Sequence, residues 1–180
     1  MKIASLAENK DYEKRVAITP EIAKKYISIG FDVSLSENYA SHLGFSDDDY
    51  KSQGVSILKD KKNLIENSDL IVQLEIPSDD NLNYLRENQS LIGVLNPFLN
   101  KEKLENLSKK KINAFSLELL PRITRAQSMD ILSSQANLAG YKAVVESFSK
   151  FEKAIPMMMT AAGTVPAAKV LIVGAGVAGL

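Results

Sequence analysis

The chain has 180 residues, of which 45% are hydrophobic and 24% are charged, and this composition is typical of an ordinary globular protein with a real core. Lysine plus arginine and aspartate plus glutamate each number 22, so no global field recruits nucleic acid or an anionic membrane surface. Cysteine is absent, which excludes disulfides, thiolate catalysis and thiolate metal sites.

Neither the beginning of the chain nor its apolar stretches indicate a targeting or membrane segment. The first ten residues carry charges and no apolar core of signal-peptide length, so we expect no export signal. The longest apolar stretches, near 154–162 and 167–173, are interrupted by Pro156, Thr160 and Lys169 and fall short of the ~20 residues of a membrane helix. We therefore expect no transmembrane segment.

Short β-rich runs alternate with amphipathic helical stretches along the chain. The predicted strands are Lys2–Leu6, Phe31–Leu35, Leu70–Leu74, Leu91–Leu95, Ile112–Leu117 and Val170–Val173. Helices are predicted over Pro20–Ile29, with Thr19 as the cap, and over Lys101–Lys110, opened by Asn100. Because strand and helix alternate, we predict an α/β fold with a mostly parallel sheet and flanking helices.

A long helix is predicted from Met129 to Phe151. Its apolar face is marked by residues at spacings of seven, three, four and three, namely Ile131, Leu138, Tyr141, Val145 and Phe148. The helix exceeds the length of a usual crossover and ends near Pro156, after which a new strand begins. We therefore interpret it as the connection between two domains.

The chain ends on a glycine pattern that follows an apolar strand directly. Val170–Val173 runs into Gly174-x-Gly176-x-x-Gly179, the dinucleotide fingerprint in its usual context. Gly174 would allow the tight turn, Gly176 would let the backbone approach a pyrophosphate, and Gly179 would permit close helix–strand packing. A purely structural glycine turn is the alternative. The acidic residue expected about 20 positions later is not included, so the fingerprint does not decide between NAD and NADP.

These features divide the chain into three segments. Residues 1–126 are predicted to form an N-terminal α/β domain, and residues 127–163 an interdomain connecting helix and linker. Residues 164–180 are predicted to be the start of a truncated Rossmann NAD-binding domain, cut inside its fingerprint.

A polar segment, Pro121–Val144, spans the start of the long helix. From spacing alone, Arg122, Arg125 and Asp130 are best interpreted as solvated charges, with Ser128 or Asp130 as a helix cap. The Met157–Met159 triplet is likewise more typical of gap filling in a core than of a cofactor pocket.

No metal site is predicted. His42 stands alone, without cysteine or a second histidine, so a surface or capping role is favoured over catalysis. Asp47–Asp49 follow Ser46 at a predicted helix start, where negative charge suits the helix dipole better than a cation site.

Three segments together resemble the alanine dehydrogenase and transhydrogenase alpha-subunit family: Arg15–Pro20, Pro121–Val144, and Met157–Pro166 with the fingerprint that follows. The spaced residues Arg122, Gln127, Asp130 and Ser133, with the methionine triplet, resemble the transhydrogenase branch. The resemblance implies two α/β domains that face each other across a cleft where NAD(H) lies. This chain would supply the first domain, the connecting helix and the opening strand of the second.

The resemblance also implies roles for individual residues. Arg122, Asp130 and Ser133 would hold the nicotinamide end of NAD(H), while Gln127 would contact the nucleotide on the partner domain. The expected catalytic residues are Gln127, Arg122 and Asp130, and the expected cofactor-binding residues are these three with Ser133, Gly174, Gly176 and Gly179. Because hydride passes directly from NADH to NADP, the enzyme needs to position the two nucleotides and requires no protein acid or base.

The implied partners lie outside this chain. The resemblance places NADP on a domain of the transhydrogenase beta subunit, and a membrane-embedded domain of the complex would couple hydride transfer to proton translocation. It further implies a homodimer, peripheral on the cytoplasmic face of the inner membrane, with no nucleic-acid partner.

Two other functions stay open from the sequence. In the dehydrogenase branch, a substrate-binding lysine and a catalytic histidine would occupy the positions of Glu75 and Asn96, and an arginine at the position of Arg15 would hold the substrate carboxylate. Asn96 has no accessible pKa for proton exchange, which disfavours an alanine dehydrogenase-like enzyme. A non-catalytic nucleotide-binding module is the third possibility, because a fold does not fix a function.

Overall fold

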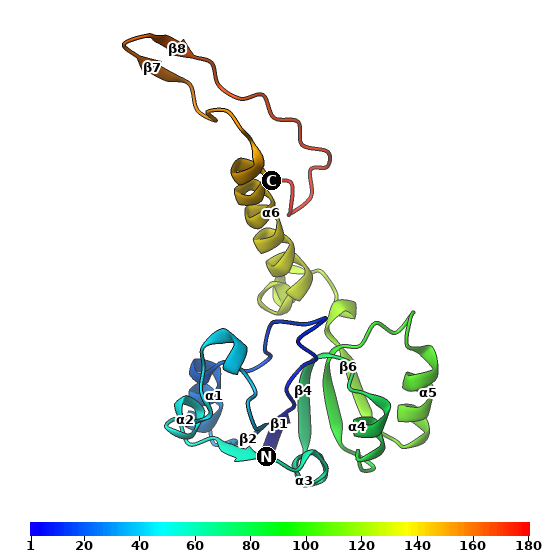
Figure 1. Cartoon of the computed structure of the whole chain (residues 1–180). Helices are drawn as coiled ribbons and strands as arrows, with labels where there is room; N and C mark the ends of the chain where they lie inside the picture. Colours follow the sequence, from blue (N-terminus) through cyan, green and yellow to red (C-terminus); the bar gives the residue numbers. More distant parts are fainter. The chain divides into compact units, whose positions relative to one another are not determined.

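The computed structural model describes all 180 residues, which form two compact units, residues 1–120 and residues 121–180 (Figure 1). The strands of the first unit are β1 (Lys2–Ser5), β2 (Asp32–Ser36), β3 (Ser56–Leu58), β4 (Leu70–Glu75), β5 (Ser90–Val94) and β6 (Asn113–Ser116). Its helices are α1 (Pro20–Ser28), α2 (Asp47–Lys51), α3 (Lys61–Glu66), α4 (Asp79–Asn83) and α5 (Lys101–Lys109), with the 3-10 turns η1 (Ser41–Leu43) and η2 (Leu117–Leu119).

The six strands form one fully parallel sheet in the order β3-β2-β1-β4-β5-β6. This is the order of a doubly wound sheet, in which the direction of winding reverses between β1 and β4. The predicted α/β class with a parallel sheet is confirmed. The strand β3 was not predicted, because three residues are too short to show a period.

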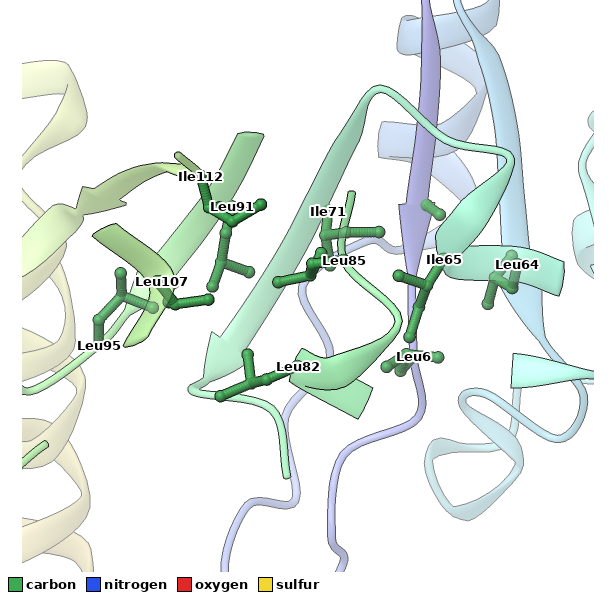
Figure 2. Packing of buried hydrophobic residues seen from close by; sticks show 11 residues of the cluster. Leu6, Leu64, Ile65, Ile71, Leu82, Leu85, Leu91, Leu95, Leu107 and Ile112 are labelled. Atoms are coloured by element: carbon green, nitrogen blue, oxygen red, sulfur yellow. The ribbon is translucent and has the colours of Figure 1, made fainter. Parts of the chain in front are cut away.

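The core consists of two hydrophobic clusters, one on each face of the sheet. Successive side chains of a strand point to opposite faces, so Ile3 joins one cluster and Ala4 the other. The cluster with Ala4 packs strand residues against α3, α4 and α5, and Figure 2 shows its side chains, among them Ile71 and Leu91, close together. The other cluster packs the sheet against α1 and α2, so both faces are covered, as parallel sheets require.

Helix starts in the first unit confirm two predicted caps and correct a third. The Thr19 hydroxyl accepts from the Ile22 amide at 3.4 Å, and Ser46 forms a reciprocal capping box with Asp49. Asn100 precedes α5 as predicted but does not cap it, because its side-chain amide donates to the Leu95 carbonyl at 2.9 Å. The asparagine ties the helix to the end of β5 instead.

The second unit contains η3 (Thr124–Met129), α6 (Ile131–Lys150), and the strands β7 (Met158–Thr160) and β8 (Gly163–Val165). The predicted long helix is confirmed, with Asp130 as its cap. Strands β7 and β8 form an antiparallel hairpin in the segment that was predicted to be a linker. None of the helices in the structure combines the length and the apolar character needed to cross a membrane.

The predicted strand at Val170–Val173 is wrong for this structure, where the segment is irregular. A strand needs a neighbour for its backbone hydrogen bonds, and β7 and β8 pair only with each other. Leu171 and Val173 are accordingly 88% and 93% exposed. The two compact units divide between Leu120 and Pro121, slightly before the predicted boundary at 126, and the division into three segments stays a prediction.

Candidate functional site

Arg122, Asp130 and Ser133 form a hydrogen-bonded cluster at the start of α6. One Asp130 oxygen accepts from the Ser133 amide at 2.9 Å, and the other accepts from the Ser133 hydroxyl at 2.7 Å and from Arg122 Nε at 3.4 Å. The Ser133 hydroxyl in turn accepts from Arg122 Nη2 at 2.8 Å. The structure thus brings together three of the four predicted polar residues, across eleven positions of sequence.

The electrostatics of this cluster separate an orienting residue from an available one. The hydrogen bonds from the Ser133 amide and hydroxyl, aided by Arg122, hold the pKa of Asp130 below its usual value. The Asp130 side chain is 16% exposed and has both oxygens engaged, whereas the Arg122 side chain is 62% exposed. Arg122 uses two of its five N–H donors here, so its fork can still bind an amide oxygen or a phosphate.

Gln127 lies on η3, between Arg122 and Asp130 in the chain. Its backbone carbonyl accepts from the Asp130 amide at 3.3 Å, while its side chain is exposed and makes no hydrogen bond in the structure. The buried Ala126 anchors this short turn from below. The Gln127 amide is therefore positioned by the turn and available to a second molecule.

The fingerprint glycines form a tight turn. Gly174 has φ of +111°, which favours glycine, and a side chain on Gly179 would collide with the Gly174 carbonyl. Gly176 faces open space, which leaves room for a ligand to approach its backbone. The Gly176 carbonyl accepts from the amides of Gly179 and Leu180 at 2.9 and 3.0 Å. The geometry fits the predicted steric needs, while the binding roles of these glycines stay predictions.

Sequence reasoning missed Gly140, which lies within α6. A β-carbon on this residue would collide with the backbone carbonyl of Ala178, next to the fingerprint turn. A single glycine inside a helical pattern gives no signal of such an approach, although its low helix propensity could have prompted the question.

In the first unit, buried polar side chains gather where β1 and β4 end. Glu8 accepts from the Leu74 amide at 2.7 Å and from Gln73 Nε2 at 3.0 Å, and Gln73 accepts in turn from the Leu6 amide at 2.7 Å. Ligands of doubly wound sheets bind at this reversal point. Here it is a polar pocket of about 250 Å³ whose lining includes the carboxylates of Glu8 and Glu75. Glu8 and Gln73 were missed because nothing in a single sequence marks a buried polar pair.

The positions that would serve a dehydrogenase are occupied differently here. Arg15 forms an ion pair with Glu13 at 2.5 Å, and this pairing lowers the pKa of Glu13. The Asn96 amide donates to Glu118 at 2.6 Å, and Asn96 itself has φ of +46°. Glu75 is exposed beside the Glu8 pocket. An anionic substrate would therefore meet carboxylates at this edge.

The isolated groups have structural surroundings. His42 Nε2 lies 2.7 Å from the Lys14 carbonyl and joins two loops, and Asp49 belongs to the capping box of α2.

Replacing Glu8 with glutamine should flatten the pH dependence of stability. Burial raises the pKa of Glu8 above its usual value, and the charges of Glu75 and Glu13 add to this. Because the folded-state pKa is the higher one, stability from this group is present below pH ~4.5 and is lost as pH rises through the raised pKa. The amide oxygen of Glu8→Gln can still accept from Leu74.

Urea unfolding between pH 4 and 7 measures this effect. Glu8→Gln should match the wild type at the acid end and exceed it at neutral pH. An exposed control, Glu21→Gln, should follow the wild-type curve throughout. If the difference between Glu8→Gln and wild type were the same at every pH, burial of this carboxyl would not be the cause.

Comparison with known proteins gives a consistent result. Residues 5–139 match the family described as "Alanine dehydrogenase/PNT, N-terminal domain", and residues 143–180 match the corresponding C-terminal domain. The first of the chains that make up NAD(P) transhydrogenase subunit alpha is 43% identical in Rhodospirillum rubrum and 41% identical in Rickettsia prowazekii, in each case over all of this chain and 48% of the relative.

Solved structures agree with these relatives. A transhydrogenase from Sinorhizobium meliloti superimposes with a TM-score of 0.90 at 40% identity, over 99% of this chain and 53% of the other. An L-alanine dehydrogenase has a TM-score of 0.70 at 22% identity, over 78% of this chain and 38% of the other, which shows a common fold. The chain spans about half the length of the curated relatives it matches. With the N-terminal family domain matched over most of its length, the chain belongs to the alanine dehydrogenase/PNT family.

Proposed function

We propose that this chain is the NAD(H)-binding portion of a proton-translocating NAD(P) transhydrogenase, an oxidoreductase. The observation that carries the proposal is the Arg122–Asp130–Ser133 cluster, in which a carboxylate with both oxygens engaged orients an arginine whose remaining donors are open. Support also comes from relatives named as transhydrogenase alpha subunits over the whole chain. A solvated helix start has no need for three residues bonded in a closed circuit.

The proposed mechanism is one of positioning. The nicotinamide of bound NADH supplies the hydride. Arg122 would donate to the nicotinamide end, and Asp130 and Ser133 would hold the guanidinium in place. Gln127, exposed on η3, would reach the nucleotide of the partner domain. Gly174, Gly176 and Gly179 would leave room for the pyrophosphate against backbone amides.

The proposal extends to partners and location. NADP(H) would lie on the beta subunit, and a membrane-embedded domain would couple hydride transfer to proton translocation. The subunit would act as a homodimer, peripheral on the cytoplasmic face of the inner membrane. Its chain would divide into an N-terminal domain (1–126), a connection (127–163) and the start of a Rossmann domain (164–180).

A version extended to the length of its relatives, mixed with an NADP-binding beta subunit, tests the proposal directly. We expect it to reduce NADP⁺ with NADH, and NADH to be bound more tightly than NADPH by this subunit in calorimetric titration. Tight NADH binding without any hydride transfer would instead identify a non-catalytic nucleotide-binding module. Preference for NADPH would contradict the assignment of NAD to this chain.

The extended version should not oxidise NADH in the presence of pyruvate and ammonia. Glu75 and Asn96 stand where an amino-acid dehydrogenase would carry lysine and histidine, and Glu8 adds a third unsuitable group. Carboxylates repel a keto-acid carboxylate, and an amide cannot exchange the proton that deamination needs.

Absorbance at 340 nm with pyruvate and ammonium measures this activity. An authentic alanine dehydrogenase assayed beside it provides the positive control. Turnover at an ordinary enzymatic rate, on the order of 1 s⁻¹ or more, would favour the dehydrogenase over the transhydrogenase.

A further inference from the structure

Helix α6 approaches the fingerprint turn with its bare backbone. Gly140 lies ten residues after Asp130 on this helix, and a β-carbon there would overlap the carbonyl of Ala178, with the Ala178 Cα 3.2 Å away. The obstacle is main chain, so no side-chain rotation relieves it. Any residue other than glycine would push α6 and the turn apart.

Two observations make this approach more than an incidental contact. Glycine in a helix interior is among the least favourable residues, so its presence in the middle of a 20-residue helix needs a compensating reason. The turn itself cannot absorb a displacement by local bending, because Gly179 is already against the Gly174 carbonyl. A shift at Ala178 would therefore move the turn as a whole.

We propose that Gly140 is a positioning residue that sets the place of the fingerprint turn relative to the Arg122–Asp130–Ser133 cluster. The cluster caps the first residue of α6, and the turn rests on the same helix ten residues further, about 15 Å along its axis at 1.5 Å per residue. One rigid helix thus carries both groups that would hold the two ends of a single dinucleotide. This inference rests on the proposed function and deepens it.

Gly140→Ala separates this role from that of an incidental helix residue, because the two predict opposite signs. Alanine is the better helix former, so an incidental glycine predicts a higher melting temperature of α6 and unchanged nucleotide binding. The positioning role predicts no such rise, displaced amide NMR signals from Gly174 to Gly179, and NADH binding weakened on the order of tenfold or more. The control Ala139→Ser adds one heavy atom at the adjacent, exposed position and should change none of these.

The measurement is an NADH titration of the 180-residue chain followed by the amide signals of the turn. Wild type should show contacts between the Gly140 α-protons and the Ala178 backbone. If Gly140→Ala bound NADH as the wild type does, the positioning role would be refuted while the proposed function stood. If the wild type gave no response to NADH at any concentration, the proposed function would fail, and with it the nucleotide role of Gly140.

A second variant guards against simple unfolding of the helix. Adding Ala178→Gly to Gly140→Ala frees the turn backbone to bend away from α6. The double variant should recover the helix, measured by circular dichroism, without recovering NADH affinity. Recovery of both would show that helix stability, and not the place of the turn, controls binding, and would overturn the proposal.

Discussion

Gln127→Ala should slow hydride transfer on the order of 10²-fold in the extended subunit with its NADP-binding partner, while NADH affinity stays within a few-fold. Hydride transfer requires the two reacting carbons to be held about 3–3.5 Å apart, so a small loss of alignment reduces the rate without a loss of binding. Gln127 is suited to alignment because its side chain is exposed and unbonded, while its backbone is fixed by the hydrogen bond to Asp130.

Single-turnover kinetics separate binding from transfer for this variant. Arg122→Ala and Asp130→Ala should impair both steps, because they dismantle the bonded cluster. Ser128→Ala, at an exposed position next to Gln127 on η3, is the matched control and should transfer hydride normally. A wild-type rate for Gln127→Ala, or a large loss of NADH affinity as its only defect, would refute the alignment role.

Leu91→Ala should destabilise the first unit by about 2–5 kcal/mol. Leu91 is fully buried at the centre of β5, in the cluster that joins the sheet to α3, α4 and α5, so truncation leaves a cavity among rigid neighbours (Figure 2). Urea unfolding at neutral pH measures the change as a lower midpoint with an unchanged slope. Leu99→Ala removes the same atoms from a side chain that is 86% exposed and should cost less than about 0.5 kcal/mol. Equal losses in the two variants would mean that burial does not determine the cost.

Much of the fold could be predicted from the sequence because burial on both faces makes parallel strands apolar and leaves turn residues between them. The bounds of β2 and α1 differ from their predicted ranges by one residue at an end. The failures have definite causes. Strand β3 is too short to show a pattern, and Val170–Val173 has the composition of a strand but no partner in this structure.

The site was accessible to sequence reasoning only to a limited extent. The fingerprint and the residues near α6 could be chosen from their types and from a family resemblance, but spacing alone favoured a solvated helix start. The circuit through Asp130 forms because η3 turns the chain back so that Arg122 reaches the first turn of α6. Such a return, like the approach of Gly140 to Ala178, is a property of three-dimensional packing that no periodicity encodes.

The exposed apolar run Val170–Val173 has a consequence for how the 180-residue chain behaves as a solute. Four consecutive exposed aliphatic side chains with unpaired backbone form a sticky segment, and the formal net charge of zero at pH 7 offers no colloidal repulsion against it. Solubility should therefore be lowest near neutral pH, close to the sequence pI of about 6.6. A single acidic residue in this run, such as Leu171→Asp, would act as a gatekeeper against self-association.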